Sequence, residues 1–217
     1  MRATRRCAAA GLLWLAAAVL PAAAQEFPAL YSVAGVSADD VLNIRSAPSA
    51  SAEIIGTLAP DQAGVEVVAA DGSGTWGLVN SGERSGWAAL RFLTQDPRDD
   101  WRKRQKQALN CFGTEPFWSL ALDETPNLTT PGGPEMPFVL LAREPGSNHS
   151  GKSGFHAVRQ GDGNVSHTEP VALSGTLTAQ QCSDGMSDRT YGISIDLLQL
   201  RGAGQLDVLT GCCSLVP

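Results

Sequence analysis

Short runs of β-forming residues, each closed by Gly, Pro, Asn, Asp or Ser, are what most constrain the fold of this chain. Residues 65–69 and 193–197 carry apolar side chains at every second position, which is the pattern of a half-buried strand. No long amphipathic helix is apparent in the second half. We therefore expect an all-β protein. The other candidate strands are 41–44, 54–58, 76–79, 86–88, 118–122, 139–142, 155–158, 171–173 and 206–209.

The candidate strands fall into two blocks. Residues 26–95 are expected to form a small barrel, and residues 109–217 a second antiparallel β domain, a meander that closes into a barrel. In the linker 96–108, acids precede bases, an order that complements a helix dipole and could support a short helix. Its basic run could contact an anionic surface, but a solvated linker is favoured because the run is short.

The N-terminus has the composition of a secretory leader. Three arginines among the first six residues precede an apolar stretch at 8–20, and small residues follow. We expect residues 1–24 to be a signal peptide, cleaved before Gln25. The apolar stretch is shorter than the about 20 residues that span a bilayer, so a retained anchor is the less favoured alternative. We expect a periplasmic or secreted protein with no stable membrane span.

The net charge of the chain limits the classes of molecule that it can bind. The chain has 16 Lys+Arg and 22 Asp+Glu, and removal of the leader leaves 13 Lys+Arg and a net charge of −9. A polyanion would be repelled in general, so nucleic acid is excluded as a partner.

Four cysteines remain after the leader, all in the second block: Cys111, Cys182, Cys212 and Cys213. An even number in an oxidising compartment indicates two disulfides, with three possible pairings. The chain has no Cys-x-x-Cys and no Cys/His spacing typical of a metal site. We therefore expect no metal and no cofactor.

Several segments of the first block resemble the bacterial SH3 domain. They are Leu-Asn-Ile-Arg-Ser-Ala-Pro-Ser at 42–49, Ile-Ile-Gly-Thr-Leu at 54–58, Trp-Gly-Leu-Val at 76–79, Gly-Trp-Ala at 86–88 and Leu-Arg-Phe-Leu at 90–93. The resemblance implies a barrel of five to six strands whose relatives commonly bind cell-wall or peptide ligands.

Two residues of this block are ligand-binding candidates. Trp76 could stack on a ligand or cover the barrel mouth, and burial is favoured because aromatic side chains mostly serve packing. Arg45 could present its guanidinium to an anionic wall group, but an internal pair with Asp71 or Glu66 is favoured. The chain carries one SH3-like unit and no attached hydrolase motif.

The second block resembles an uncharacterised bacterial envelope family. Its motifs are Gly-Thr-Glu-Pro-Phe-Trp at 113–118, Cys-Ser-Asp-Gly-Met-Ser-Asp-Arg-Thr-Tyr at 182–191, and Gly-Cys at 211–212. The resemblance implies no activity. It does imply a Cys182–Cys212 disulfide, which leaves Cys111–Cys213. Adjacent strand residues face opposite sides and can reach different partners, whereas ring strain opposes a vicinal Cys212–Cys213 bridge.

Polar and aromatic residues of these motifs are the remaining ligand-binding candidates: Glu115, Trp118, Asp184, Asp188 and Arg189. Carboxylates near an arginine could form a pocket or an acid/base pair. Asp-Gly and Ser-Asp are also common in turns, and this structural role is favoured. The chain offers no nucleophile with a base at recognisable spacing, so no catalytic residue is expected.

The sequence favours a non-catalytic periplasmic binding or adaptor protein whose SH3-like barrel contacts peptidoglycan or an envelope peptide. An inhibitor that protects the envelope from a lytic enzyme is the alternative. A hydrolase that uses Glu115, Asp184 and Asp188 is a weaker one.

Overall fold

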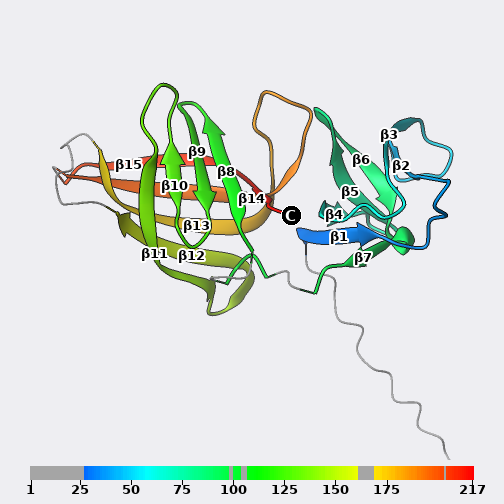
Figure 1. Ribbon diagram of the computed structural model, residues 1–217, viewed down its shortest axis with the longest axis horizontal. Helices are drawn as coiled ribbons and strands as arrows, with labels where there is room; N and C mark the ends of the chain where they lie inside the picture. The colour runs from blue at the N-terminus through cyan, green and yellow to red at the C-terminus, as the bar shows by residue number, and fades with distance from the viewer. Residues whose placement is uncertain (1–26, 98–99, 104–106, 161–168, 203) are drawn as a thin grey trace, which may run out of the picture.

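The computed structural model describes residues 27–97, 100–103, 107–160, 169–202 and 204–217, which form two β domains side by side (Figure 1). The expected all-β class is confirmed. The predicted signal peptide and its cleavage site before Gln25 lie outside the described residues. Over the described ranges, no helix has the length and apolar character needed to cross a membrane.

The first domain is a seven-stranded sheet in the order β3-β2-β6-β5-β4-β1-β7. Strands β1 and β7 were not expected from the sequence; β1 pairs with β4 on one side and with the edge strand β7 on the other. The short 3-10 turn η1 (Leu90–Phe92) precedes β7. The strands are β1 (Ala29–Val33), β2 (Leu42–Arg45), β3 (Ile54–Leu58), β4 (Val65–Ala70), β5 (Trp76–Ser81), β6 (Arg84–Ala89) and β7 (Leu93–Gln95).

A tight hairpin joins β5 to β6 and sets the register of this domain. Ser81 pairs with Arg84, so only two residues form the turn, and Gly82 adopts a positive φ of 59°. Two-residue hairpin turns favour glycine because they need positive φ values that other residues adopt at a cost. The turn lies next to the second domain (Figure 1).

The second domain is a closed antiparallel barrel, as expected. Each strand pairs with the next along the chain, and β15 pairs with β8 to close the circle. Leu120, Phe138, Leu177 and Ile193 are among the fully buried side chains of its interior. The strands are β8 (Leu109–Thr114), β9 (Phe117–Leu122), β10 (Asn127–Thr129), β11 (Met136–Gly146), β12 (His149–Arg159), β13 (Pro170–Cys182), β14 (Tyr191–Arg201) and β15 (Leu206–Leu215).

Two disulfides staple the barrel, with the pairing that the family resemblance implied. Cys111–Cys213 joins paired residues of β8 and β15 inside the barrel core, with 4.0 Å between the Cα atoms. Cys182–Cys212 joins the end of β13 to β15, and Cys212 lies outside that core. The adjacent cysteines therefore serve opposite faces of one strand, as the alternation of side chains requires.

The linker between the domains is packed against the barrel. Its described residues form turns and no helix, and residues 98–99 and 104–106 of the expected short helix lie outside the described residues. Trp101, which precedes the basic run, is only 5% exposed and belongs to the barrel core, whereas Lys103 within the run is exposed. Leu30 of β1 belongs to the same core. The two domains thus share buried apolar contacts.

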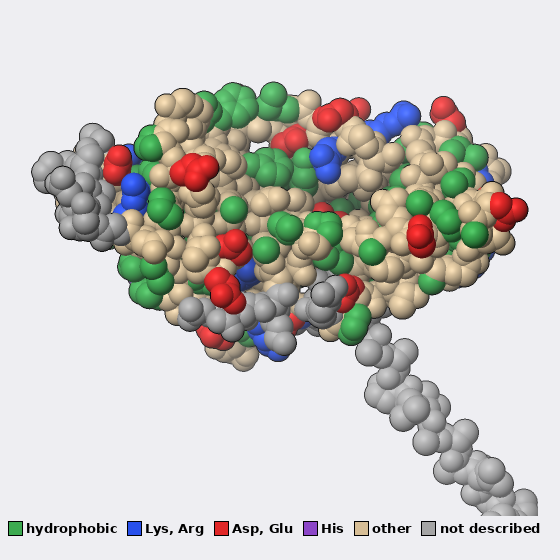
Figure 2. Space-filling model, viewed as in Figure 1, with side chains coloured by type: hydrophobic (Ala, Val, Ile, Leu, Met, Phe, Trp, Pro, Cys, Tyr) green, Lys and Arg blue, Asp and Glu red, His purple; other side chains and the backbone are tan. Residues whose placement is uncertain are grey.

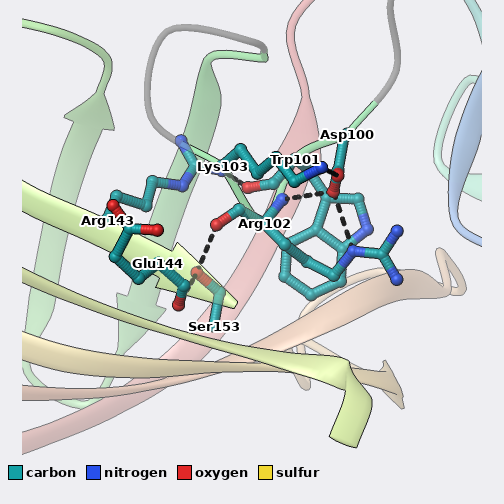
Figure 3. A network of polar contacts seen from close by, with 7 residues as sticks. All are labelled: Asp100, Trp101, Arg102, Lys103, Arg143, Glu144 and Ser153. Carbon is teal, nitrogen blue, oxygen red and sulfur yellow. Dashed lines mark hydrogen bonds and ion pairs between the residues drawn. The ribbon is translucent and has the colours of Figure 1, made fainter. Parts of the chain in front are cut away.

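A buried arginine holds the linker in place (Figure 3). Arg143 on β11 is 1% exposed and donates hydrogen bonds to the carbonyl oxygens of Trp101 and of Gln107, the latter at 2.9 Å. Burial lowers the pKa of Arg143 to about 10, so the side chain remains charged at neutral pH. The hydroxyl of Ser153 on β12 donates to the Arg102 carbonyl oxygen at 2.7 Å. This network fixes the linker backbone across one end of the barrel.

Candidate functional site

Two tryptophans share one face of the β5–β6 hairpin. Leu78 pairs with Trp87, and Trp76 pairs with Ala89, so the two indoles project from the same side with Leu78 between them. Both tryptophans are half-buried, and neither belongs to the core of the first domain. Trp76 was a sequence candidate, whereas Trp87 was not among the candidates and also lies on this face. We call Trp76, Leu78 and Trp87 the tryptophan face.

The turn before β5 fixes the backbone at Trp76. The Asp71 carboxylate accepts hydrogen bonds from the main-chain N–H groups of Ser73, Thr75 and Trp76 at 3.1, 2.9 and 2.8 Å, and from the Ser73 hydroxyl at 2.6 Å. The Ser73 hydroxyl and the Trp76 amide lower the pKa of Asp71 to about 2. This carboxylate is therefore occupied by its own turn.

Arg45 has a structural partner that the sequence did not indicate. Its guanidinium donates to the carbonyl oxygen of Ala52 at 2.7 Å and so closes the loop between β2 and β3. The expected pair with Asp71 or Glu66 is wrong: Asp71 serves its own turn, and the Glu66 carboxylate accepts from the Leu215 amide at 3.3 Å.

In the barrel, Asp184 organises the loop between β13 and β14. Its carboxylate accepts from the amides of Met186 and Ser187, each at 2.9 Å, and from the Ser187 hydroxyl. Burial raises the pKa of Asp184, but these hydrogen bonds outweigh burial and lower it overall. The sequence favoured a turn role for this aspartate over a pocket role, and the hydrogen bonds are those of a turn.

Asp188 and its neighbours connect the two domains. The Asp188 amide donates to Glu83 O at 2.9 Å, and the Asp188 carbonyl accepts from the Ser85 amide at 3.1 Å. The Ser85 hydroxyl also accepts from the Thr190 amide at 2.7 Å, and Asn80 donates to the Thr190 carbonyl. The conspicuous 182–191 segment thus reaches from the barrel to the β5–β6 hairpin.

Arg189 packs beside this junction. Its guanidinium carbon lies 5.4 Å from the centre of the Tyr191 ring, a cation–π distance. Neither Arg189 nor Asp188 lines the cavities beside the β8–β9 turn. These two cavities therefore bring Asp184 together with neither Asp188 nor Arg189.

Two adjoining hollows do bring other candidates together around the β8–β9 turn. A pocket of about 480 Å³ is lined by Trp118 and Asp184, and a groove of about 1090 Å³ by Glu115 and Asp184. Hydrophobic side chains gather on the surface over this turn (Figure 2). Trp118 is buried, and its indole ring packs directly against Gly113. A Cβ at position 113 would lie 2.2 Å from the indole nitrogen, so only glycine leaves room for the ring.

Two residues at these hollows were missed from the sequence. Phe117 is 53% exposed and Met186 is 70% exposed, and both line the pocket and the groove. The signal for Phe117 was present: since Trp118, Leu120 and Leu122 occupy the inward positions of β9, Phe117 must point outward. Met186 follows a Gly in a polar turn, where an apolar side chain has no core to enter.

The comparison with protein families identifies the first domain. Residues 40–94 match the family model of the bacterial SH3 domain. The match spans β2 to β7 and includes the tryptophan face. Neither a curated protein nor a solved structure matches the chain. Among the described residues, no group of three or more His, Cys, Asp and Glu side chains is arranged to hold a metal ion.

Proposed function

We propose that this chain is a non-catalytic binding protein of the bacterial envelope, in which the SH3 domain contacts peptidoglycan or an envelope peptide. The match of residues 40–94 to the bacterial SH3 domain carries this proposal. The two disulfides also fit an extracellular or periplasmic protein.

The tryptophan face is the surface that we assign to the ligand. Trp76 and Trp87 offer two half-buried indoles, and the Asp71 turn holds the backbone of Trp76 before any ligand arrives. Preorganised aromatic side chains lose little conformational entropy on binding, and their faces suit sugar rings and apolar peptide side chains alike. The hairpin that carries them is also braced by the barrel through Ser85 and Asn80.

A non-catalytic role is supported by the tasks of the polar candidates. Asp184 is engaged by its own turn, and the main chain of Asp188 joins the domains. Neither arrangement resembles a nucleophile oriented by a neighbouring base. Arg45, the other candidate in the SH3 domain, closes a loop.

Co-sedimentation with purified insoluble peptidoglycan tests the proposal. The full chain, produced with its own leader in a bacterial periplasm, should sediment with the wall material. Trp76→Ala should weaken the association by about tenfold, the usual minimum for loss of an aromatic anchor. Ser49→Ala is the control, because Ser49 is exposed in a loop of the same domain and lies outside the tryptophan face. Absence of sedimentation, or equal loss in both variants, contradicts the peptidoglycan proposal.

Export by the predicted leader is part of the same proposal. The purified protein should begin at Gln25, which intact-mass spectrometry of the periplasmic product measures directly. A product that retains residues 1–24 would instead support an anchor.

A further inference from the structure

The second domain carries a surface whose construction the SH3 proposal does not use. Two turns meet there, the β8–β9 turn and the loop that begins after Cys182. The Thr114 hydroxyl donates to the Asp184 carbonyl oxygen at 3.1 Å and joins the turns directly. The Asp184 carboxylate fixes its own loop, and the Cys182–Cys212 disulfide ties that loop to β15. The surface is therefore formed before any ligand arrives.

The pocket between these turns is mainly apolar. Its walls include Phe112, Phe117, Trp118, Pro131 and Met186, and its volume of about 480 Å³ falls in the range of ligand pockets. Phe117 and Met186 remain largely exposed at its mouth. A large apolar or aromatic side chain from a ligand would cover both and occupy the pocket.

The adjoining groove is polar and carries net negative charge. Glu115, Asp184 and Asp196 line it against a single cation, Lys152. Within the described residues, no ion pair or hydrogen bond engages the carboxylates of Glu115 and Asp196. Hydroxyl groups of β13 to β15 complete the wall, including those of Thr178 and Thr210. Free carboxylates beside exposed hydroxyls suit a ligand with cationic groups and amide hydrogen-bond partners.

We propose that this pocket and groove form a peptide-binding site for an extended cationic segment of a partner protein. A large apolar side chain of the segment enters the pocket, and neighbouring Lys or Arg side chains meet Glu115 and Asp196 in the groove. The whole chain has a net charge of −6, so its field also attracts a cationic partner. The site lies on the barrel and is independent of the function proposed for the SH3 domain.

Fluorescence anisotropy with short labelled peptides tests this site on the full chain. The probe is an amidated acetyl-KKFKK peptide, and its comparison peptides are acetyl-EEFEE and acetyl-KKSKK. The first should bind in a salt-dependent manner, whereas loss of the charge or of the aromatic side chain should each weaken binding by about tenfold or more.

Variants of the chain locate the binding. Phe117→Ser, and separately Glu115→Gln with Asp196→Asn, should each weaken acetyl-KKFKK binding by about tenfold. Val208→Ser is the matched control, because Val208 is 63% exposed on the barrel but lines neither hollow. Equal affinity for the acidic peptide, or equal loss in the control, overturns the proposal. So does a purified muropeptide that binds more tightly than acetyl-KKFKK and loses affinity in the same variants.

Discussion

The SH3 domain and the barrel are both antiparallel β structures, but they are held together by different means. Strands of the SH3 domain span three to six residues, and its described residues contain no cysteine. Strands of the barrel reach thirteen residues, the sheet closes on itself, and two disulfides cross it.

This difference indicates which domain supports the other. Leu30 of the SH3 domain and Trp101 of the linker both belong to the barrel core, so buried surface of the first domain depends on the second. The β5–β6 hairpin is hydrogen-bonded to the 182–191 segment as well. We infer that the barrel is the structural base on which the SH3 domain and its tryptophan face are mounted.

Removal of the core disulfide should have the largest effect on stability. Cys111→Ala with Cys213→Ala opens a link with a sequence separation of 102 residues, and the loop-closure entropy corresponds to about 5 kcal/mol of unfolding free energy. Cys182→Ala with Cys212→Ala has a separation of 30 and should cost about 1 kcal/mol less. Urea denaturation measures both. If the SH3 domain keeps its wild-type midpoint in the first variant, the barrel is not its base.

Trp101→Ala should have the second-largest effect on stability. Truncation of this buried side chain leaves a cavity where linker, barrel and SH3 domain meet, at a cost of about 3–5 kcal/mol. Phe117→Ala is the matched aromatic control, with an expected change of about 0.5 kcal/mol or less because the ring is exposed. Thermal unfolding compares the two. Similar melting temperatures would show that the linker adds little to the shared core.

Ser85→Ala should have a moderate effect at the junction. The change removes the acceptor of the Thr190 amide and the donor to Asn80, which should cost about 1–2 kcal/mol. Amide hydrogen exchange at Thr190 should become faster in the variant. Ser49→Ala, in an exposed loop, is the control. Unchanged protection at Thr190 would contradict the interdomain contact.

The smallest of these effects on stability is expected from the protonation of Asp71 in acid. Since the folded-state pKa of about 2 lies below the ordinary aspartate value of 3.8, ionised Asp71 stabilises the fold above pH 3.8, and this stabilisation is lost as the pH falls towards 2. The melting temperature of Asp71→Asn should therefore lie below that of the wild type at neutral pH, and the gap should close in acid. A gap that stays constant down to pH 2 would exclude this origin.

Much of the fold follows from local patterns, and the exceptions have tertiary causes. The β-former runs at 54–58 and 193–197 lie within observed strands. Strand β1 was missed because its two neighbours, β4 and β7, come from distant segments, and β10, with three residues, is too short to show a period. The linker has the charge order of a helix, yet its described residues form turns, and among them Trp101 is buried in the barrel core.

The candidate sites were predictable in part. Turn chemistry predicted the hydrogen bonds that Asp184 accepts within its own loop, and a ligand contact at Trp76 stays a prediction. The pairing of the β8–β9 turn with the loop after Cys182 was not foreseeable, because a contact across 70 residues leaves no local signal. Phe117 and Met186 line a common pocket only because these two segments lie in contact.

Because Cys212 and Cys213 are adjacent, oxidative folding must direct each of them to a different partner cysteine. If the chain is exported as proposed, Cys111 and Cys182 emerge from the translocon before Cys212 and Cys213, yet they are not native partners. An oxidant that acts in order of emergence would join them, and two neighbouring thiols would then have to resolve the error by exchange. The yield of correctly bridged protein should therefore fall sharply in a host that lacks a disulfide isomerase.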